Sequence, residues 1–158
     1  MTKFLYIFDI DGTLADDSHR SDFLIGSPKN WDAYFNRLEH DYPIENVRLI
    51  FNALNCHEFN GYTKLVFLTG RSAKYRKQTL AWLKKHIDPK IQDEDLYMRP
   101  ENDFRDDTLI KYETYGQIRS DYPEHMFLGV FEDRERVVKM WQAKGVFVFD
   151  VSQGRGNF

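Results

Sequence analysis

The sequence predicts an α/β fold: a Rossmann-like, mostly parallel sheet with helices on both faces and a small helical cap inserted after the first strand. Short apolar runs of strand length alternate with segments whose apolar residues recur every three or four positions, a pattern typical of parallel sheets. The segment between the first two runs is too long for a plain loop. Ligands of such folds bind outside the carboxyl ends of the strands, so functional residues are expected where the apolar runs end.

The expected strands are short runs rich in β-branched and aromatic residues. They are Lys3–Phe8 and the ranges 64–68, 95–98, 126–131 and 146–150. Helices are expected between them, at about 73–86, 106–120 and 134–144. Leu80, Leu83 and Ile87 show the spacing that gives a helix one apolar face.

The expected cap, at about 15–61, has helical patterns near 31–38 and 44–59. Pro28 and Pro43 lie near the expected starts of these helices, where proline is tolerated. The alternative is a crossover helix with an irregular entrance. In either case we expect a single domain over 1–158, with a core formed by 1–14 and 62–158.

Composition favours a globular protein that lies outside membranes. A chain of 158 residues can bury roughly two thirds of the surface that its unfolded form exposes. No apolar run approaches the roughly 20 residues needed to span a bilayer, no signal peptide is evident, and one cysteine cannot form an internal disulfide framework. We therefore expect a soluble cytoplasmic protein without an obligate protein partner.

The net charge of −3 argues against a protein that coats nucleic acid through a broad basic surface. It does not exclude a pocket in which a few arginines bind one phosphate group or a short strand end.

Asp9 and Asp11 stand at the end of the first apolar run, directly before Gly12. Residues i and i+2 of an extended segment point the same way, so both carboxylates can face one reacting atom. Two acids this close favour a hard divalent cation such as Mg²⁺, which prefers oxygen ligands. Gly12 allows a sharp turn where a Cβ would collide with a bound phosphate. The alternative is an aspartate-rich surface turn.

Thr69, Gly70 and Arg71 follow the second apolar run and precede a predicted helix. A hydroxyl, backbone N–H groups and a helix N-terminus suit a phosphate group. The alternative is local: Ser72 caps the helix and Thr69 completes the strand.

Glu132 and Asp133 end the fourth run, at the edge of the sheet where Asp9 is also expected. Asp133 is expected to be a further metal ligand, with Glu132 holding a metal-bound water. In the alternative, the two acids only cap the following helix. Asp107 and Lys111 are four residues apart on a predicted helix, which by itself indicates an exposed ion pair.

This ordered set resembles the haloacid dehalogenase superfamily. The resemblance rests on Asp-x-Asp-Gly-Thr at 9–13, Thr69, Lys111, Glu132 and Asp133, and it spans nearly the whole chain. A narrower resemblance, to the 3′-phosphatase domain of phage-type polynucleotide kinases, includes 69–71, 98–99, 103–107, 132–134 and 137–141. The chain departs from these relatives at Glu132, where they carry aspartate, and it lacks the phosphate-binding motif of a kinase.

The resemblance implies a magnesium-dependent phosphatase of nucleic-acid repair that forms an aspartyl-phosphate. Asp9 is implied as the nucleophile and Asp11 as the general acid and base. Thr69 and Lys111 are implied as ligands of the transferring oxygens. The implied metal ligands are Asp9, Asp133 and, through its backbone carbonyl, Asp11. The implied substrate-side residues are Gly70, Arg20, Arg71, Asp107 as the partner of Lys111, and more weakly Arg99 and Arg105.

Three functions stay open: a 3′-phosphatase of DNA or RNA ends, a phosphatase of nucleotides or sugar phosphates, and a non-catalytic module that binds phosphorylated ends. The cap differs in length and content from the cap expected of the family, which bears on the choice of substrate. Within it, Trp31, Tyr34 and Phe35 have helical spacing. They form either a platform for a terminal base or part of the core.

Overall fold

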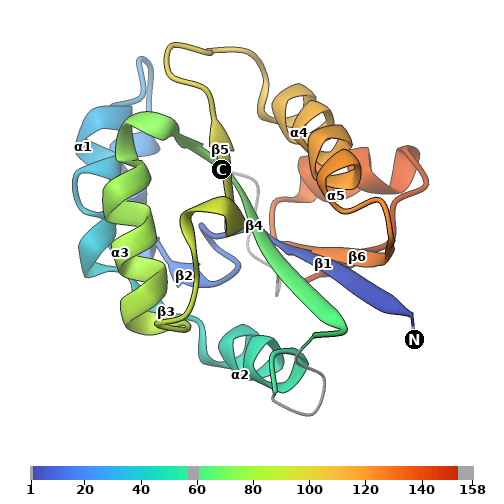
Figure 1. Ribbon diagram of the computed structural model, residues 1–158. Helices are drawn as coiled ribbons and strands as arrows, with labels where there is room; N and C mark the ends of the chain where they lie inside the picture. Colours follow the sequence, from blue (N-terminus) through green and yellow to red (C-terminus); the bar gives the residue numbers. More distant parts are fainter. Residues whose placement is uncertain (1, 57–60, 153–158) are drawn as a thin grey trace.

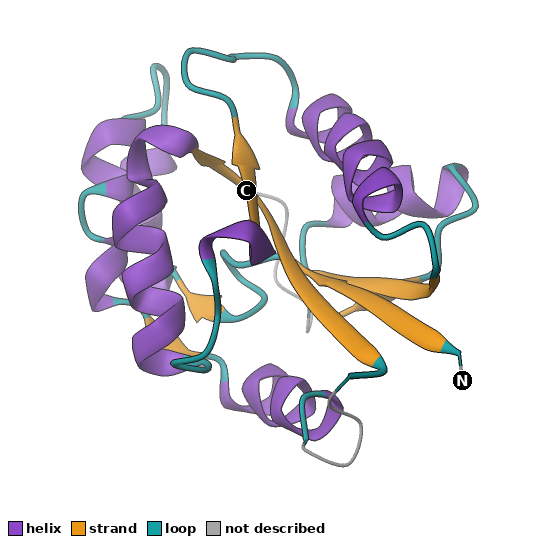
Figure 2. Ribbon diagram, in the orientation of Figure 1, coloured by secondary structure: helices purple, strands orange, loops and turns teal. Residues whose placement is uncertain are grey.

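The structure is a computed structural model that describes residues 2–56 and 61–152. Its centre is a five-stranded sheet in the order β5-β4-β1-β6-β7, and every neighbouring pair is parallel. The strands are β1 (Lys3–Phe8), β4 (Thr63–Ser72), β5 (Leu96–Arg99), β6 (His125–Glu132) and β7 (Val148–Asp150). The predicted fold class is therefore confirmed (Figures 1 and 2).

Helices cover both faces of the sheet, as the alternating pattern predicts. They are α2 (Glu45–Leu54), α3 (Arg76–His86), α4 (Asp107–Asp121) and α5 (Glu135–Ala143). Successive side chains of β1 point to opposite faces of the sheet and so pack against different helices. Leu5 and Ile7 pack with Ile118 of α4 and Trp141 of α5, whereas Phe8 packs on the opposite side with residues of α2 and α3.

The segment between β1 and β4 is more broken than the sequence predicts. Its two-residue strands β2 (Ala15–Asp16) and β3 (Tyr42–Pro43) pair antiparallel. Three short helical pieces lie between these strands: η1 (Ser18–Leu24), α1 (Trp31–Phe35) and η2 (Leu38–His40). The pattern near 31–38 indicates α1, but β2, β3, η1 and η2 show no periodic pattern in the sequence.

The boundaries of the predicted cap helices need correction. The helix expected over 31–38 ends at Phe35, and the one expected over 44–59 ends at Leu54; residues 57–60 lie outside the described part of the chain. Pro43 belongs to β3 rather than to a first helical turn. Pro28 precedes α1 by three positions, and Asn30 caps that helix by accepting a hydrogen bond from the N–H of Ala33 at 3.0 Å.

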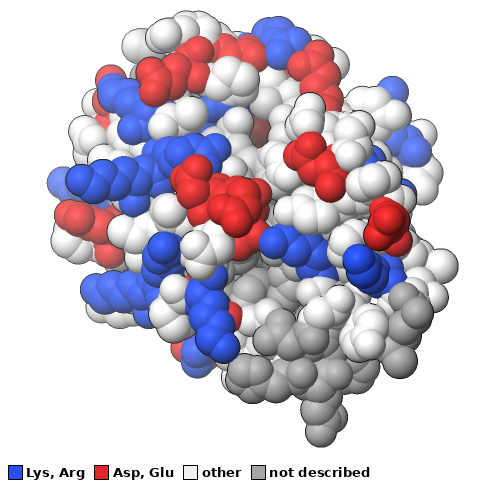
Figure 3. All heavy atoms as spheres, in the orientation of Figure 1, with Lys and Arg blue, Asp and Glu red and all other residues white. Residues whose placement is uncertain are grey.

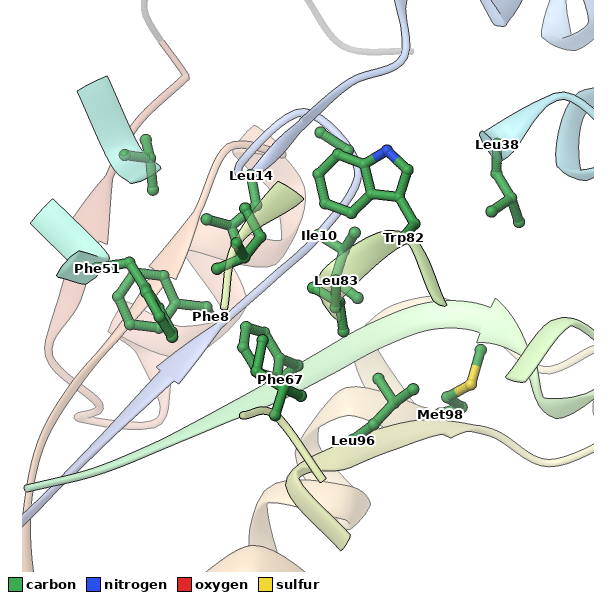
Figure 4. Packing of buried hydrophobic residues seen from close by; sticks show 14 of the residues in the cluster. Phe8, Ile10, Leu14, Leu38, Phe51, Phe67, Trp82, Leu83, Leu96 and Met98 are labelled. Carbon is green, nitrogen blue, oxygen red and sulfur yellow. The ribbon is translucent and has the colours of Figure 1, made fainter. Parts of the chain in front are cut away.

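The inserted segment plays two structural roles. Helix α2 packs on the sheet like a crossover helix: the Phe51 ring lies 5.4 Å from that of Phe8 and 5.7 Å from that of Phe67, between centroids (Figure 4). The α1 region instead packs against the start of α3, where the rings of Phe35 and Tyr75 are 5.0 Å apart. Only this second part contributes to the cavity described below.

Further short elements complete the description: η3 (Ala73–Tyr75) leads into α3, and η4 (Asp93–Asp95) leads into β5. Among the described helices, none has both the length and the apolar character needed to cross a lipid bilayer.

The packing of α2 gives a test of stability. Phe51 is buried, so Phe51→Ala removes a core ring and is expected to lower the free energy of unfolding by about 3 to 5 kcal/mol. The matched control is Leu49→Ala on the same helix, where the side chain is 59% exposed, with an expected change within about 0.5 kcal/mol. Urea unfolding followed by circular dichroism measures both. Equal effects would contradict a core role for α2.

Candidate active site

The carboxyl ends of β1, β4 and β6 bring together acids that are far apart in the sequence. Asp9 follows β1, and its N–H donates to the carbonyl oxygen of Phe131 in β6 at 3.0 Å. Glu132 ends β6, and Asp133 follows it. The parallel register of β1 and β6 thus places the three carboxylates at one edge of the sheet.

Asp9, Glu132 and Asp133 form a buried cluster in which one carboxylate oxygen from each lies within 4.8 Å of the others. Thr13, also buried, links two of them: its hydroxyl is 3.2 Å from Asp133 Oδ1 and 3.4 Å from Asp9 Oδ2. The sequence analysis gave Thr13 no role beyond its place in the motif, and it expected Glu132 to contact the metal only through a bound water. In the structure Glu132 is itself a member of the cluster.

Lys111 reaches into this cluster from α4. Its Nζ lies 2.9 Å from Asp9 Oδ1 and 2.7 Å from Glu132 Oε2, but 3.9 Å from Asp107 Oδ2. Burial alone would lower the pKa of Lys111, but the two nearer carboxylates hold it above its ordinary value, so the side chain is an ammonium. Lys111 and Asp107 are buried. The local expectation of an exposed ion pair is therefore wrong.

The single positive charge of Lys111 does not neutralise three ionised carboxylates in the cluster. Burial, reinforced by the charge of Glu132, raises the pKa of Asp9 well above its ordinary value. The same two causes raise the pKa of Asp133 to about 6. A divalent cation would relieve this repulsion, and a donor set made only of oxygens suits Mg²⁺. The residues therefore fit the ion that the sequence implies.

Gly12 is required by the position of Asp133. It has a φ of +80°, and a Cβ built on it would lie 2.1 Å from Asp133 Oδ2. The sequence analysis expected the collision to be with a bound phosphate; in the structure it is with a carboxylate of the cluster. Any side chain at position 12 would push Asp133 away from Asp9 and Glu132.

The carboxylate of Asp11 lies outside the cluster, and the metal ligand expected of this residue is its backbone carbonyl. Arg71 donates to both its oxygens, at 2.9 and 2.7 Å, and Arg20 Nη2 lies 2.5 Å from Oδ1. Burial alone would raise the pKa of Asp11, but the charges and hydrogen bonds of Arg71 and Arg20 hold it well below its ordinary value. Asp11 is therefore a carboxylate fixed by two guanidinium groups.

Arg20 and Arg71 were expected to bind substrate phosphate, yet both are fully buried. Besides Asp11, both contact Asp41, a buried acid that sequence reasoning missed. Arg20 Nε lies 2.7 Å from Asp41 Oδ1, and Arg71 Nη2 lies 3.3 Å from Oδ2. His19 Nε2 is 2.9 Å from the same Oδ1. The two arginines thus orient Asp11 and leave little donor capacity for a substrate.

Thr69 and Gly70 lie at the end of β4, beside β1. The Thr69 hydroxyl oxygen accepts from the N–H of Arg71 at 3.2 Å. Gly70 leaves room for Asp107, since a Cβ there would lie 2.5 Å from Asp107 Oδ1. The structure therefore places Gly70 directly beside the carboxylate of Asp107.

Asp107 forms ion pairs with two arginines on the wall of the cavity. Arg99 Nη2 is 3.2 Å from its Oδ1, and Arg134 Nη1 is 3.1 Å from its Oδ2. Arg134 was not singled out from the sequence, because its proximity depends on the packing of β6 against α4. Arg105 is exposed and pairs with Asp103 and Glu113.

A cavity of about 620 Å³ opens over this edge of the sheet. Asp9, Asp11 and Lys111 line it together with Trp31, Arg99 and Phe104. Figure 3 shows acidic and basic side chains interspersed over the viewed face, in keeping with a net charge of −3.

Known proteins are similar to this chain in sequence or in fold. The family model described as polynucleotide kinase PNKP phosphatase domain, of the HAD type, matches residues 4–158. The chain is 32% identical over 136 residues to a protein of Autographa californica nuclear polyhedrosis virus named "Putative bifunctional polynucleotide kinase/RNA ligase". That match covers 85% of this chain but 17% of the viral protein.

Solved structures agree with the family match. A chain of the Pnkp1/Rnl/Hen1 RNA repair complex superposes with a TM-score of 0.70 at 26% identity, covering 95% of this chain and 42% of that one. The class C acid phosphatase of Bacillus anthracis, with tungstate bound, shares the fold with a TM-score of 0.61 at 14% identity, covering 92% and 62% of the two chains. The chain belongs to the family of the polynucleotide kinase PNKP phosphatase domain, and it is a phosphatase of the haloacid dehalogenase type.

Proposed function

We propose that this phosphatase domain removes 3′-phosphate groups from DNA or RNA ends, with Mg²⁺ and through an aspartyl-phosphate on Asp9. The observation that carries the proposal is the buried cluster of Asp9, Glu132 and Asp133. Lys111 donates a hydrogen bond to Asp9, and Asp11 lies two residues after Asp9 in the sequence. The names of the relatives, a polynucleotide kinase/RNA ligase and an RNA repair complex, support nucleic-acid ends as the substrate class.

Asp9 is the proposed nucleophile because it alone combines a place in the cluster with a place on the cavity wall. A bound Mg²⁺, held by Asp9, Asp133 and the backbone carbonyl of Asp11, would neutralise charge on the phosphate oxygens. An Asp9 oxygen attacks the phosphorus, a bond forms to that oxygen, and the bond to the 3′ oxygen of the sugar breaks. Lys111 stabilises charge at the site, and Thr69 is the proposed hydroxyl ligand of the transferring oxygens.

Asp11 is the proposed proton carrier. In the first step it gives a proton to the departing 3′ oxygen, and in the second it takes one from the water that attacks the phosphorus. The carboxylate form that Arg20 and Arg71 favour is the one required in the second step. The proton that Asp11 gives in the first step is the one that it takes from water in the second step of the preceding turnover.

The nucleophile is tested by Asp9→Asn. The amide cannot form the phosphoryl ester, so we expect phosphate release from a 3′-phosphorylated oligonucleotide to fall by at least about a thousandfold, with an unchanged circular dichroism spectrum. Asp22→Asn is a control in an acid that has no place in the cluster or the cavity. Turnover by Asp9→Asn at the wild-type rate would refute the covalent route.

The role of Gly12 in holding the cluster is tested by Gly12→Ala. We expect this variant to lose both phosphatase activity and the rise in melting temperature that Mg²⁺ gives the wild type, because the new methyl group displaces Asp133. Gly26→Ala is the matched control, since Gly26 also has a positive φ, of +89°, but nothing lies within 4 Å of its Cβ position. In both variants backbone strain lowers the free energy of unfolding by about 1 kcal/mol. An active, magnesium-stabilised Gly12→Ala protein would contradict the proposed ion site.

The substrate class is tested by a turnover panel. A 3′-phosphorylated DNA oligonucleotide and its RNA counterpart are compared with free mononucleotides and sugar phosphates, each with added Mg²⁺ and again with a chelator. We expect the highest kcat/KM for the oligonucleotides and no turnover after chelation. Preference for the free monoesters would establish a small-molecule phosphatase instead, and full activity with chelator would exclude the ion.

A further inference from the structure

The aromatic triplet of α1 divides into two buried rings and one exposed ring. Tyr34 and Phe35 belong to the core, whereas Trp31 is 44% exposed and lines the cavity that also contains Asp9. The Trp31 ring stacks on that of Phe35 at 5.9 Å and 21°, and Phe35 in turn contacts Tyr75. Trp31 is therefore an exposed indole braced by buried rings, with an orientation set before any ligand arrives.

A second exposed ring lines the same cavity. Phe104, in the loop between β5 and α4, is 91% exposed. The backbone on either side of it is fixed, because Arg99 Nη1 donates to the carbonyl oxygens of Asp103 at 3.1 Å and of Arg105 at 2.7 Å. Figure 1 shows this loop and α1 at the same end of the sheet. The fold thus holds two water-exposed rings on the walls of one cavity.

The cations of the cavity wall are already paired with acids. Lys74 Nζ is 3.0 Å from Asp32 Oδ1, Arg99 contacts Asp107, and Arg136 Nη1 is 2.8 Å from Asp106 Oδ2. Contacts from these groups to the phosphates of a strand would compete with existing ion pairs. Stacking of a base on an aromatic ring does not compete with these ion pairs, and it strengthens binding by roughly five- to a hundredfold per base.

We propose that Trp31 and Phe104 stack against the base of the nucleotide whose phosphate reaches Asp9, and that this pair selects phosphate monoesters that carry a nucleobase. The inference rests on the proposed function and specifies its substrate. Every base presents an aromatic face, so the pair distinguishes base-bearing ends from sugar phosphates without selecting one base.

Kinetics on two matched substrates test the pair. One is a 3′-phosphorylated oligonucleotide, and the other is the same strand with an abasic terminal nucleotide. We expect the wild type to prefer the base-bearing end by about tenfold in kcat/KM, and Trp31→Leu and Phe104→Ala each to reduce that preference severalfold with little change on the abasic end. Phe147→Ala removes an exposed ring that lies outside the cavity and should leave the preference intact.

A binding measurement makes the test independent of turnover. Of the three tryptophans in the chain, Trp82 and Trp141 are buried, so fluorescence quenching by a stacked base reports chiefly on Trp31. A nucleoside 3′-monophosphate added to the Asp9→Asn protein should quench emission, and the quenching should be absent when Trp31→Leu is combined with it. Trp31→Phe keeps an aromatic ring and should retain most of the base preference, which separates loss of stacking from loss of folding.

The outcomes distinguish the two proposals. If the wild type turns over both strand ends equally and no quenching occurs, the stacking pair is refuted while the 3′-phosphatase function stands. If neither strand is turned over but sugar phosphates are, both proposals fail. Equal losses on the two ends in Trp31→Leu and Phe104→Ala would also refute base selection, because a merely structural role lowers both rates alike.

Discussion

The arrangement of this domain depends on how negative charge is neutralised at one edge of its sheet. Asp9, Asp11, Glu132 and Asp133 lie at or directly after the ends of parallel strands, and most of their surface is buried. Carboxylates held this close and away from water repel one another strongly. The structure pairs these carboxylates with two different sets of cations. Lys111 forms ion pairs with Asp9 and Glu132. Arg20 and Arg71 form ion pairs with Asp11.

This division has a chemical meaning within the proposed mechanism. The cluster around Asp9 keeps an excess of negative charge, which favours binding of a divalent cation. The group around Asp11 is neutralised by guanidinium groups instead, so that carboxylate stays free of the ion and available for proton transfer. Two aspartates separated by one residue thus acquire different tasks from their surroundings.

The sequence was sufficient for the parts of the fold and site that follow from strand topology. Parallel strands place their carboxyl ends together, so the acids after β1 and β6 could be predicted to lie near each other, and the alternating apolar pattern predicted the two helical layers. Asp41 could not be found this way, because it lies between η2 and β3, which have three and two residues and leave no periodic signal. The partners of Arg20 and Arg71 were ambiguous for a chemical reason: a guanidinium fork binds a carboxylate as well as a phosphate.

The inserted segment is anchored by charge at two points, and this restricts where the chain can vary. Arg20 and Asp41 are both buried and bonded to each other, so the twenty positions between them form a loop clamped at its base. Within that loop Tyr34, Phe35 and Leu38 belong to the core, whereas residues 25–30 are exposed, so changes of length at 25–30 would alter the segment that leads to Trp31 without removing core contacts. Variation in length is therefore easiest at residues 25–30 of this clamped loop, where it costs little stability.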